Sequence, residues 1–361
     1  MKKHLGRQAK KAVGLAVGAA LVLTAVAGCG NSSSGNTDEV SSVSQEEETD
    51  NSSTEALVTM KLGHGLSGSG MAGQTYQKFA DLVSELSDGT MEVQIYSDGT
   101  LISDSDSFDS VISGTIDFTH EAVNRESGTI PDLALLEIPG YFVGETDTWL
   151  DFAESLREPL TDLYANYNIK YIAGNYQGTS VFLSNGFQIT SPEDLSGKSV
   201  RATGTWLSRA VETWGGAAVS LGLADLPNGL ERGTVDAAYT AWSVAIPNSL
   251  YEVSDYITYT NICETYACLL MNLDTWNSLT AEQQDILMEA GRQFEEYSVE
   301  LAVQMEEEGK QTAAENGCEV YTLTDEEKAA FVDELDPLFE ECSTSLTENG
   351  KEILDIINSY K

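Results

Sequence analysis

Hydrophobic residues recur along the chain with two different periods, one typical of strands and one typical of helices. Alternation of apolar and polar residues at 57–62 predicts a strand, and the apolar spacing at 75–86 predicts a helix with one buried face. The same patterns predict a short helix at 108–112 and strands at 91–96, 115–119, 169–173, 181–184 and 198–202. Strands interrupted so often by helices indicate an α/β fold rather than a sandwich of sheets.

Three helix starts carry residues that cap free backbone N–H groups. They are residues 191–194, with Pro at the first turn, and the capping boxes at 280–283 and 324–327. From residue 280 an apolar stripe continues to Met305, through roughly seven turns. A long helix is therefore expected there.

The first 28 residues have the pattern of an export signal. Basic residues within 2–11 precede an apolar stretch at 12–27, and small residues lead into Cys29. This resembles a bacterial lipobox, whose cysteine is lipidated and becomes the new N-terminus; an ordinary signal peptide with a chance cysteine is the alternative. Residues 29–55 are mostly polar and acidic, which predicts a flexible tether. We therefore expect a lipid-anchored protein on the extracytoplasmic face of the cell membrane.

Composition excludes several classes of function. The 361 residues suffice for two lobes, and 41% hydrophobic residues can form a packed core. With 58 acidic and 19 basic residues, the net charge is −39. This argues against binding nucleic acid or docking on an anionic membrane through surface charge. Three His and five Cys without close spacing predict neither a metal site nor a haem, and no cofactor is expected.

The cysteines other than Cys29 allow three pairings. They are Cys263, Cys268, Cys318 and Cys342. The five-residue spacing of the first two fits neither a redox CxxC motif nor a metal knuckle. Buried free thiols are the favoured state.

Motifs of catalysis are absent from the sequence. It has no Gly-x-Ser-x-Gly elbow, no phosphate-binding loop and no His-Glu-x-x-His. Residues 68–73 match Gly-x-Gly-x-x-Gly, but no acid is suitably placed on a second strand. We interpret 63–73 as an adaptable loop beside a ligand cleft. His64, His120 and Glu121 lie near this loop and are candidate ligand contacts; for each His, an ordinary hydrogen-bonded side chain is the alternative.

Five segments in register carry a resemblance to a known family. Residues 191–201 (SPEDLSGKSVR) are similar to a "thr-pro-glu-asp-leu-lys-gly-leu-lys-ile-arg" stretch of TRAP-type (tripartite ATP-independent periplasmic) transporter solute-binding receptors, the DctP family. The other segments are 114–118, 138–142, 233–236 and 251–253. Their order and spacing hold from about residue 58 to residue 339.

The resemblance implies a fold of two lobes, each a sheet flanked by helices, with the ligand cleft between them. Lobe I is expected at 56–177, completed by about 266–305, and lobe II at 178–265, completed by about 306–361. The chain is expected to cross between lobes near 177–179 and again near 264–267. Ligand should draw the lobes together at these crossings.

The implied function is capture of a small carboxylate, without catalysis, for membrane subunits driven by an ion gradient. In the family, the arginine matching Arg201 pairs with the ligand carboxylate. A guanidinium suits a carboxylate because its planar fork donates two parallel hydrogen bonds. Arg201 also ends a predicted strand, where open α/β sheets place ligands. The alternative is a salt bridge between Arg201 and one of the many acids.

The chain departs from the family pattern at three binding positions. This chain has Val181 where the family has a second arginine. The family's asparagine aligns near Thr240, and its pocket aromatic aligns near Leu223. With one cation fewer, a monocarboxylate with an apolar or amphipathic body is favoured over a dicarboxylate or sialic acid. Tyr239 and Trp242 are expected to touch it. Thr179, Thr240 and Leu223 complete the candidate ligand contacts.

Three other functions fit parts of the sequence. The binding protein of an ATP-driven importer shares the two-lobed plan, and a ligand-sensing lipoprotein shares the anchor. A secreted hydrolase would need a nucleophile and base, and the sequence offers no such pair.

Overall fold

The computed structural model describes residues 57–142, 146–262 and 266–360. The predicted signal peptide, Cys29, the tether and Cys263 lie outside the described residues. Among the described helices, none combines the length and apolar character that crossing a membrane requires.

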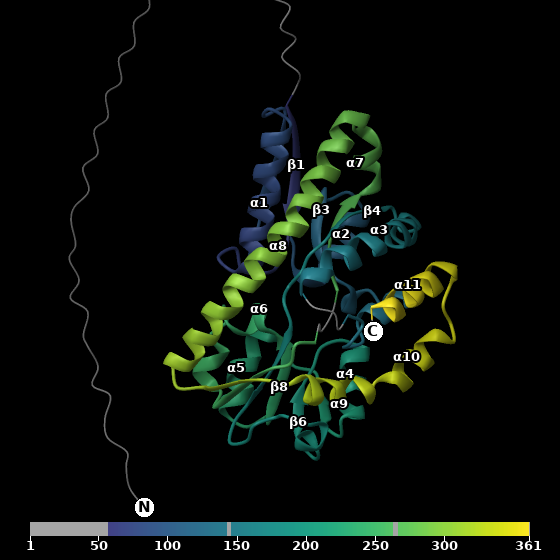
Figure 1. Ribbon diagram of the computed structural model, residues 1–361. Helices are drawn as coiled ribbons and strands as arrows, with labels where there is room; N and C mark the ends of the chain where they lie inside the picture. Colours follow the sequence, from purple (N-terminus) through teal and green to yellow (C-terminus); the bar gives the residue numbers. More distant parts are fainter. Residues whose placement is uncertain (1–56, 143–145, 263–265, 361) are drawn as a thin grey trace, which may run out of the picture. The chain divides into compact units, whose positions relative to one another are not determined.

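Two separate sheets form the framework of the described chain (Figure 1). The first has the strand order β2-β1-β3-β10-β4, and the second has the order β11-β9-β5-β8-β6-β7. The strands of the first sheet are β1 (Val58–Gly63), β2 (Met91–Tyr96), β3 (Phe118–Ala122), β4 (Ile169–Gly174) and β10 (Ala267–Asn272). Those of the second are β5 (Ser180–Ser184), β6 (Ser199–Arg201), β7 (Ala217–Val219), β8 (Ala237–Ala241), β9 (Tyr256–Tyr259) and β11 (Glu319–Thr322).

Each sheet is completed by a strand from much later in the sequence. β10 pairs antiparallel with both β3 and β4 and is buried along its whole length, as a central strand requires. β11 pairs parallel with β9 at the edge of the second sheet. Residues 175–179 carry the chain from the first sheet to the second, where the sequence predicts a crossing.

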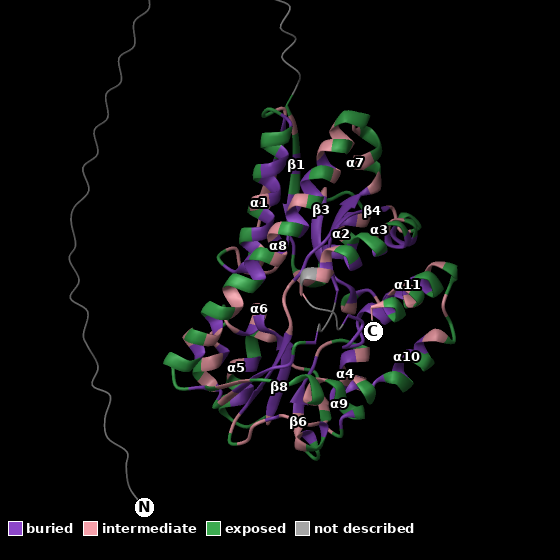
Figure 2. Ribbon diagram, in the orientation of Figure 1, coloured by how far each residue is buried: buried purple, intermediate pink, exposed green. Residues whose placement is uncertain are grey.

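Helices cover both sheets. They are α1 (Met71–Leu86), α2 (Ser107–Ile112), α3 (Trp149–Ala165), α4 (Thr205–Thr213), α5 (Leu226–Glu231), α6 (Trp242–Ala245), α7 (Leu273–Ser278), α8 (Ala281–Glu315), α9 (Asp325–Asp333), α10 (Asp336–Ser343) and α11 (Glu348–Ser359). Figure 2 shows buried strands between helices whose outer faces are exposed. The last helix, α11, packs against α3 beside the first sheet, whereas the sequence predicts that residues 306–361 complete the second lobe.

The described chain has two halves, each made of one sheet and the helices packed on it, and the long helix α8 contacts both. Its first part packs against α1 and β4, and its later part contacts α6 and β11 (Figure 1). It begins at the predicted capping box, where Thr280 Oγ1 accepts the Gln283 N–H at 3.3 Å. The predicted box at Thr324 also begins a helix, α9.

Two expected elements differ from the structure. The strand expected at 115–119 begins only at Phe118, because the N–H groups of Thr115 and Ile116 both bond to Ser110 O and close the turn after α2. The cap at 191–194 is present, but it begins a single 3₁₀ turn, Pro192–Leu195, rather than an α-helix. Cys268, Cys318 and Cys342 are buried free thiols, as expected.

Candidate functional site

A cavity of about 260 Å³ lies beside the crossing and is lined by residues from both halves of the described chain. Its walls come from the loop after β1, from the crossing and from the segments after β7 and β8. The lining residues are Gly65, Leu66, Ser67, Gly70, Met71, Ala72, Asp98, Asp104, Asn175, Gln177, Leu223, Ser243, Val244, Pro247 and Asn248. Its volume is slightly below the range of about 300–1,000 Å³ usual for ligand pockets. Polar and apolar residues contribute about equally to the lining, which suits a small polar solute.

The glycine-rich loop between β1 and α1 forms one wall. Its amides are already bonded within the protein: Gly65 N–H donates to Asp104 Oδ1 at 2.9 Å, and Gly68 N–H donates to Asp98 Oδ2 at 3.1 Å. Amides that are bonded to carboxylates in this way are not free to bind phosphate oxygens, as the amides of a dinucleotide site are. The loop is therefore a cavity wall, as expected, and not a dinucleotide-binding turn.

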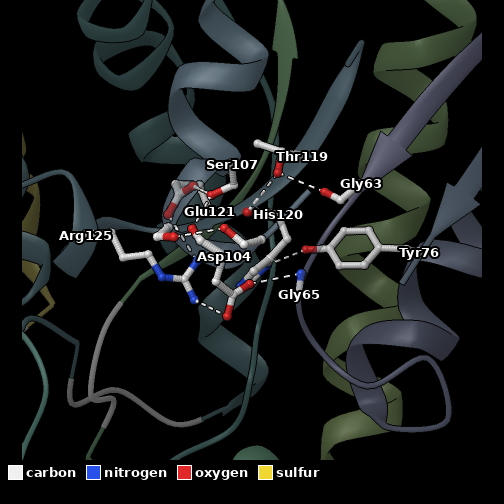
Figure 3. A network of polar contacts seen from close by, with 11 residues as sticks. Gly63, Gly65, Tyr76, Asp104, Ser107, Thr119, His120, Glu121 and Arg125 are labelled. Atoms are coloured by element: carbon white, nitrogen blue, oxygen red, sulfur yellow. Dashed lines mark hydrogen bonds and ion pairs between the residues drawn. The ribbon is translucent and has the colours of Figure 1, made fainter. Parts of the chain in front are cut away.

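Behind this loop, the buried Glu121 belongs to an ionic network whose other charged members, Arg125 and Asp104, are partly exposed (Figure 3). Its carboxylate accepts the Ser107 hydroxyl at 2.5 Å and Arg125 Nη1 at 3.2 Å, while Arg125 Nη2 reaches Asp104 Oδ2 at 3.2 Å. Burial raises the pKa of Glu121, although the positive charge of Arg125 opposes the shift. Glu121 is fully buried and is not among the lining residues; it binds Arg125, which also binds Asp104, and its contact with a ligand stays a prediction.

A second network connects His120 to the cavity wall. Tyr76 OH lies 2.6 Å from His120 Nδ1, and Asn175 Nδ2 donates to Tyr76 OH at 3.0 Å (Figure 3 shows Tyr76 and His120). Burial lowers the pKa of His120 well below its usual value, so the ring is neutral. The Tyr76 hydroxyl, which accepts from Asn175, can then donate to Nδ1.

Several buried polar atoms around the cavity have no hydrogen-bond partner within the described part of the chain. They are both ring nitrogens of His64, Asn175 Oδ1, Gln177 Nε2, Thr179 Oγ1, Trp242 Nε1 and Ser243 Oγ. Leaving such a group unsatisfied costs about 1–3 kcal/mol each. Asn175, Gln177 and Ser243 line the cavity, so their unpartnered atoms are available for a ligand there, whereas His64, Thr179 and Trp242 are not among the lining residues. Of these residues, the sequence predicted His64, Thr179 and Trp242 as ligand contacts.

Gly178 allows the crossing to adopt its backbone conformation and to pack closely against Trp242. Its φ is +76°, and a Cβ there would overlap Trp242 Nε1 and lie 2.7 Å from Trp242 Cδ1. Only glycine fits this combination of left-handed backbone and close packing. The indole of Trp242 is thus held against the crossing and fully buried.

On the second sheet, Arg201 ends β6, as predicted, and its side chain is 5% exposed. Arg201 Nε donates to Leu221 O at 3.1 Å, two residues before Leu223 in the cavity wall. Arg201 itself is not among the described lining residues. Its role toward a ligand therefore stays a prediction.

Thr240 and Tyr239 lie on opposite faces of β8. Thr240 is directly opposite Val181 of β5, so two of the departures from the family pattern are cross-strand neighbours. Tyr239 packs against Phe182 and Trp214, with ring centroids 4.6 and 5.5 Å apart, and is fully buried. The ring forms part of the aromatic core, and the expected contact of Tyr239 with a ligand stays a prediction.

The sequence missed Asn175 and Ser243 as candidate contacts and named Gln177 only as part of the crossing. Each follows the carboxyl end of a strand, β4 for Asn175 and Gln177 and β8 for Ser243. That position was the available signal, because ligands of open α/β sheets bind beyond the carboxyl ends of strands. Among the described residues, no three His, Cys, Asp or Glu side chains are grouped to hold a metal ion.

Comparison with known proteins consistently identifies bacterial solute-binding proteins as similar to this chain. A family profile described as "Bacterial extracellular solute-binding protein, family 7" (DctP) matches residues 62–345. The ectoine-binding periplasmic protein TeaA of Halomonas elongata is 26% identical over 285 residues, which cover 77% of this chain and 83% of TeaA.

Solved structures share the fold. A TRAP periplasmic solute-binding protein from Ochrobactrum anthropi, with its C-terminus bound in the ligand-binding pocket, has a TM-score of 0.76 and 21% identity, covering 84% of this chain and 96% of that one. Another, from Rhodoferax ferrireducens with bound malonate, has a TM-score of 0.75 and 21% identity, covering 83% and 98%. Both likenesses bear on the fold alone.

Proposed function

This chain belongs to family 7 of the bacterial extracellular solute-binding proteins, the receptors of TRAP-type transporters, and we propose that it captures a small organic acid with a single carboxylate. The family is one of extracellular binding proteins rather than enzymes. The observation that carries the proposal is the cavity between the two sheets, with unpartnered buried polar atoms in its walls. Such a site binds and releases a solute without needing a nucleophile or a metal.

Arg201 is the proposed partner of the carboxylate. It is a buried cation at the end of β6, and its Nε bond to Leu221 O supports the segment that leads to Leu223 in the cavity wall. A fixed guanidinium in a low-dielectric setting attracts an anion strongly. The abundant surface acids make such a local cation necessary, because an approaching carboxylate is repelled by the rest of the protein.

A single carboxylate is favoured by the pairing of Val181 with Thr240. Where the family pattern has an arginine and an asparagine, this chain has an aliphatic and a hydroxyl side chain in register on adjacent strands. A second carboxylate of the solute would lack its cation there. The relatives do not decide this point, since TeaA is named for ectoine and the Rhodoferax protein holds malonate.

The proposal also includes how the protein is held at the membrane and to which partner it delivers the solute. We expect Cys29 to carry the lipid anchor, residues 29–55 to form the tether, and the membrane subunits of a TRAP transporter to receive the solute. Ligand should also draw the two halves together about the crossing at 175–179. Small-angle scattering with and without a confirmed ligand measures this closure as a smaller radius of gyration.

A thermal-shift screen of organic acids on the purified protein tests the proposal. A ligand at ~100 times its dissociation constant should stabilise the protein by about 2.7 kcal/mol. Monocarboxylates should give the largest shifts. If no organic acid stabilises the protein, the proposed function is wrong; if only dicarboxylates do, the restriction to one carboxylate is wrong.

A further inference from the structure

We propose that Glu137 holds the two halves of the protein together around a bound solute and thereby sets how fast the solute is released. This inference rests on the proposed function, because it assumes that the protein closes on an organic acid. It is carried by hydrogen bonds that join the halves outside the crossing, and by a glycine that makes room for them.

Glu137 is held in the first-sheet half. It follows the 3₁₀ turn Pro131–Leu136, and Leu136 O accepts the Tyr266 N–H at 3.0 Å, immediately before β10. Ser127, from the segment after β3, donates its hydroxyl to Glu137 Oε2 at 2.5 Å. The Glu137 side chain is fully buried. Its position is therefore set by its own half, through one carboxylate oxygen and the neighbouring backbone.

The other carboxylate oxygen is bound by the second-sheet half. Glu137 Oε1 accepts the Trp206 N–H at 2.7 Å and the Leu207 N–H at 3.4 Å, both in the first turn of α4. First-turn N–H groups have no acceptor within their helix, and the helix dipole favours a negative charge beside them. α4 begins at Thr205, shortly after Arg201 ends β6. The bonds thus join the part of the second half that carries the proposed carboxylate partner to the first half.

Gly204 makes room for this contact. Its φ is +83°, and a Cβ there would overlap Glu137 Oε1 and lie 3.1 Å from Asn124 Cβ, in the segment that follows β3 of the first sheet. Glycine is the residue that tolerates both this backbone and this close approach. It also provides no side chain to cap α4. The acceptor for the N-terminus of α4 therefore comes from the other half of the protein.

These bonds depend on how the halves are arranged. Glu137 and Trp206 lie on opposite sides of the crossing at 175–179 along the chain. An N–H···O bond does not persist beyond about 3.5 Å between donor and acceptor, so separation of the halves about the crossing breaks both bonds. A contact that is made in only one of two arrangements stabilises that arrangement. Loss of Glu137 should therefore favour the open arrangement and speed the release of a trapped solute.

Stopped-flow measurement of solute release tests the proposal. The probe is the acid with the largest shift in the thermal-shift screen, which includes lactate, pyruvate, butanoate and pentanoate. Glu137→Ala should release it about 10- to 100-fold faster than the unaltered protein, because buried hydrogen bonds to a charged group are lost from the closed arrangement only. The association rate should change much less. Glu137→Gln, whose amide oxygen still accepts, should fall between the two proteins. An unchanged dissociation rate in Glu137→Ala would overturn the inference.

Two control variants separate this role from a general loss of stability. Ser127→Ala removes the bond to Oε2 within the first half and leaves both bonds to α4, so its release rate should stay normal. Thr324→Ala removes the cap of α9 within the second half, where Thr324 Oγ1 accepts the Glu327 N–H at 3.3 Å. It should lower stability, as loss of a cap does, without changing the release rate. Release as fast from Thr324→Ala as from Glu137→Ala would contradict the proposal.

Hydrogen exchange supplies an arm that uses only the unaltered protein. Saturating probe should slow exchange of the Trp206 amide by about 10-fold or more, because this amide is freed only when the halves separate. The Glu327 amide, which is capped within the second half, should respond less. Equal exchange of the Trp206 amide with and without probe would overturn the inference while the proposed function stands. If no acid of the thermal-shift screen binds, the proposed function fails and the inference falls with it.

Discussion

The carboxylate of Glu137 caps the first turn of α4, where Glu137 Oε1 accepts the Trp206 N–H at 2.7 Å. Glu137 precedes α3 of the first-sheet half, whereas α4 packs on β7 of the second sheet. The helix has no side-chain cap from its own N-cap residue, Gly204. A buried carboxylate from the other half therefore supplies the acceptor that the N-terminus of α4 needs.

Removal of this cap should destabilise the protein. Glu137→Ala leaves the N–H groups of Trp206 and Leu207 without their acceptor, at a cost of about 1–3 kcal/mol in urea unfolding. Glu137→Gln should lose less, because an amide oxygen can still accept. Ser127→Ala, which removes only the hydroxyl bonded to Glu137 Oε2, is the control. A Glu137→Ala protein as stable as the unaltered one would show that the cap contributes nothing.

Arg201→Ala should weaken solute binding while the protein stays folded. Loss of one partner from a buried charge pair costs about 2–5 kcal/mol, which is roughly 30-fold to several thousand-fold in affinity. Arg201→Lys should recover part of the loss, since an ammonium lacks the planar fork. Calorimetry with a ligand identified by the screen measures both, with Arg209→Ala on α4 as a control cation paired to Glu341. Near-normal affinity in Arg201→Ala would refute the assignment.

Gly178→Ala should destabilise the crossing between sheets. The left-handed backbone costs about 1–2 kcal/mol for a residue with a Cβ, and the overlap with Trp242 adds about 1–3 kcal/mol. Gly186→Ala isolates the backbone contribution, because Gly186 has a φ of +80° but no atom within 4 Å of an added Cβ. Thermal unfolding should show the larger loss for Gly178→Ala; equal losses would mean that the contact with Trp242 has no effect.

Stability should fall as the pH rises from about 5 to about 8 because of Glu126. Burial, with Glu121 and Asp109 nearby and Arg125 opposing, raises the pKa of Glu126 from 4.5 to about 8. The folded protein then keeps a proton that the unfolded chain releases, so stability declines by up to about 1.4 kcal/mol per pH unit in this window. Glu126→Gln should flatten the dependence in urea titrations, and Glu158→Gln, at an exposed position, should not. Identical slopes for both variants would exclude this origin.

Cys29→Ser should release the protein from the membrane or leave an unprocessed precursor. The expectation follows from the small residues before Cys29 and the polar segment after it. Fractionation of cells and the mass of the mature protein measure the outcome. Unchanged membrane retention with normal processing would rule out lipid at this position.

Sequence patterns predicted most elements of the fold because each strand and helix carries its own period. What they could not predict was which distant segments pair. Asn175 directly follows Gly174, the last residue of β4. Gly174 pairs with Cys268 of β10, a strand that lies almost a hundred residues later in the sequence. Likewise, alternation along β8 places Tyr239 and Thr240 on opposite faces but does not say which face meets the aromatic core of Phe182 and Trp214. The helices and strands could be predicted from local sequence patterns, whereas the residues of the candidate site are brought together by pairing between distant strands.

In the proposed closure of the two halves, the helix α8 would act as a lever arm about the crossing. Glu295 Oε1 accepts the Gly174 N–H at 2.7 Å and Ser298 Oγ accepts the Tyr176 N–H at 3.1 Å, which fixes the middle of the helix to the start of the crossing. From Ser298 to Glu315 the helix extends about 25 Å beyond this fulcrum, at 1.5 Å per residue. Each 10° of rotation there moves its far end by about 4 Å. A small rotation at the crossing would therefore become a larger displacement of the protein surface at the end of α8.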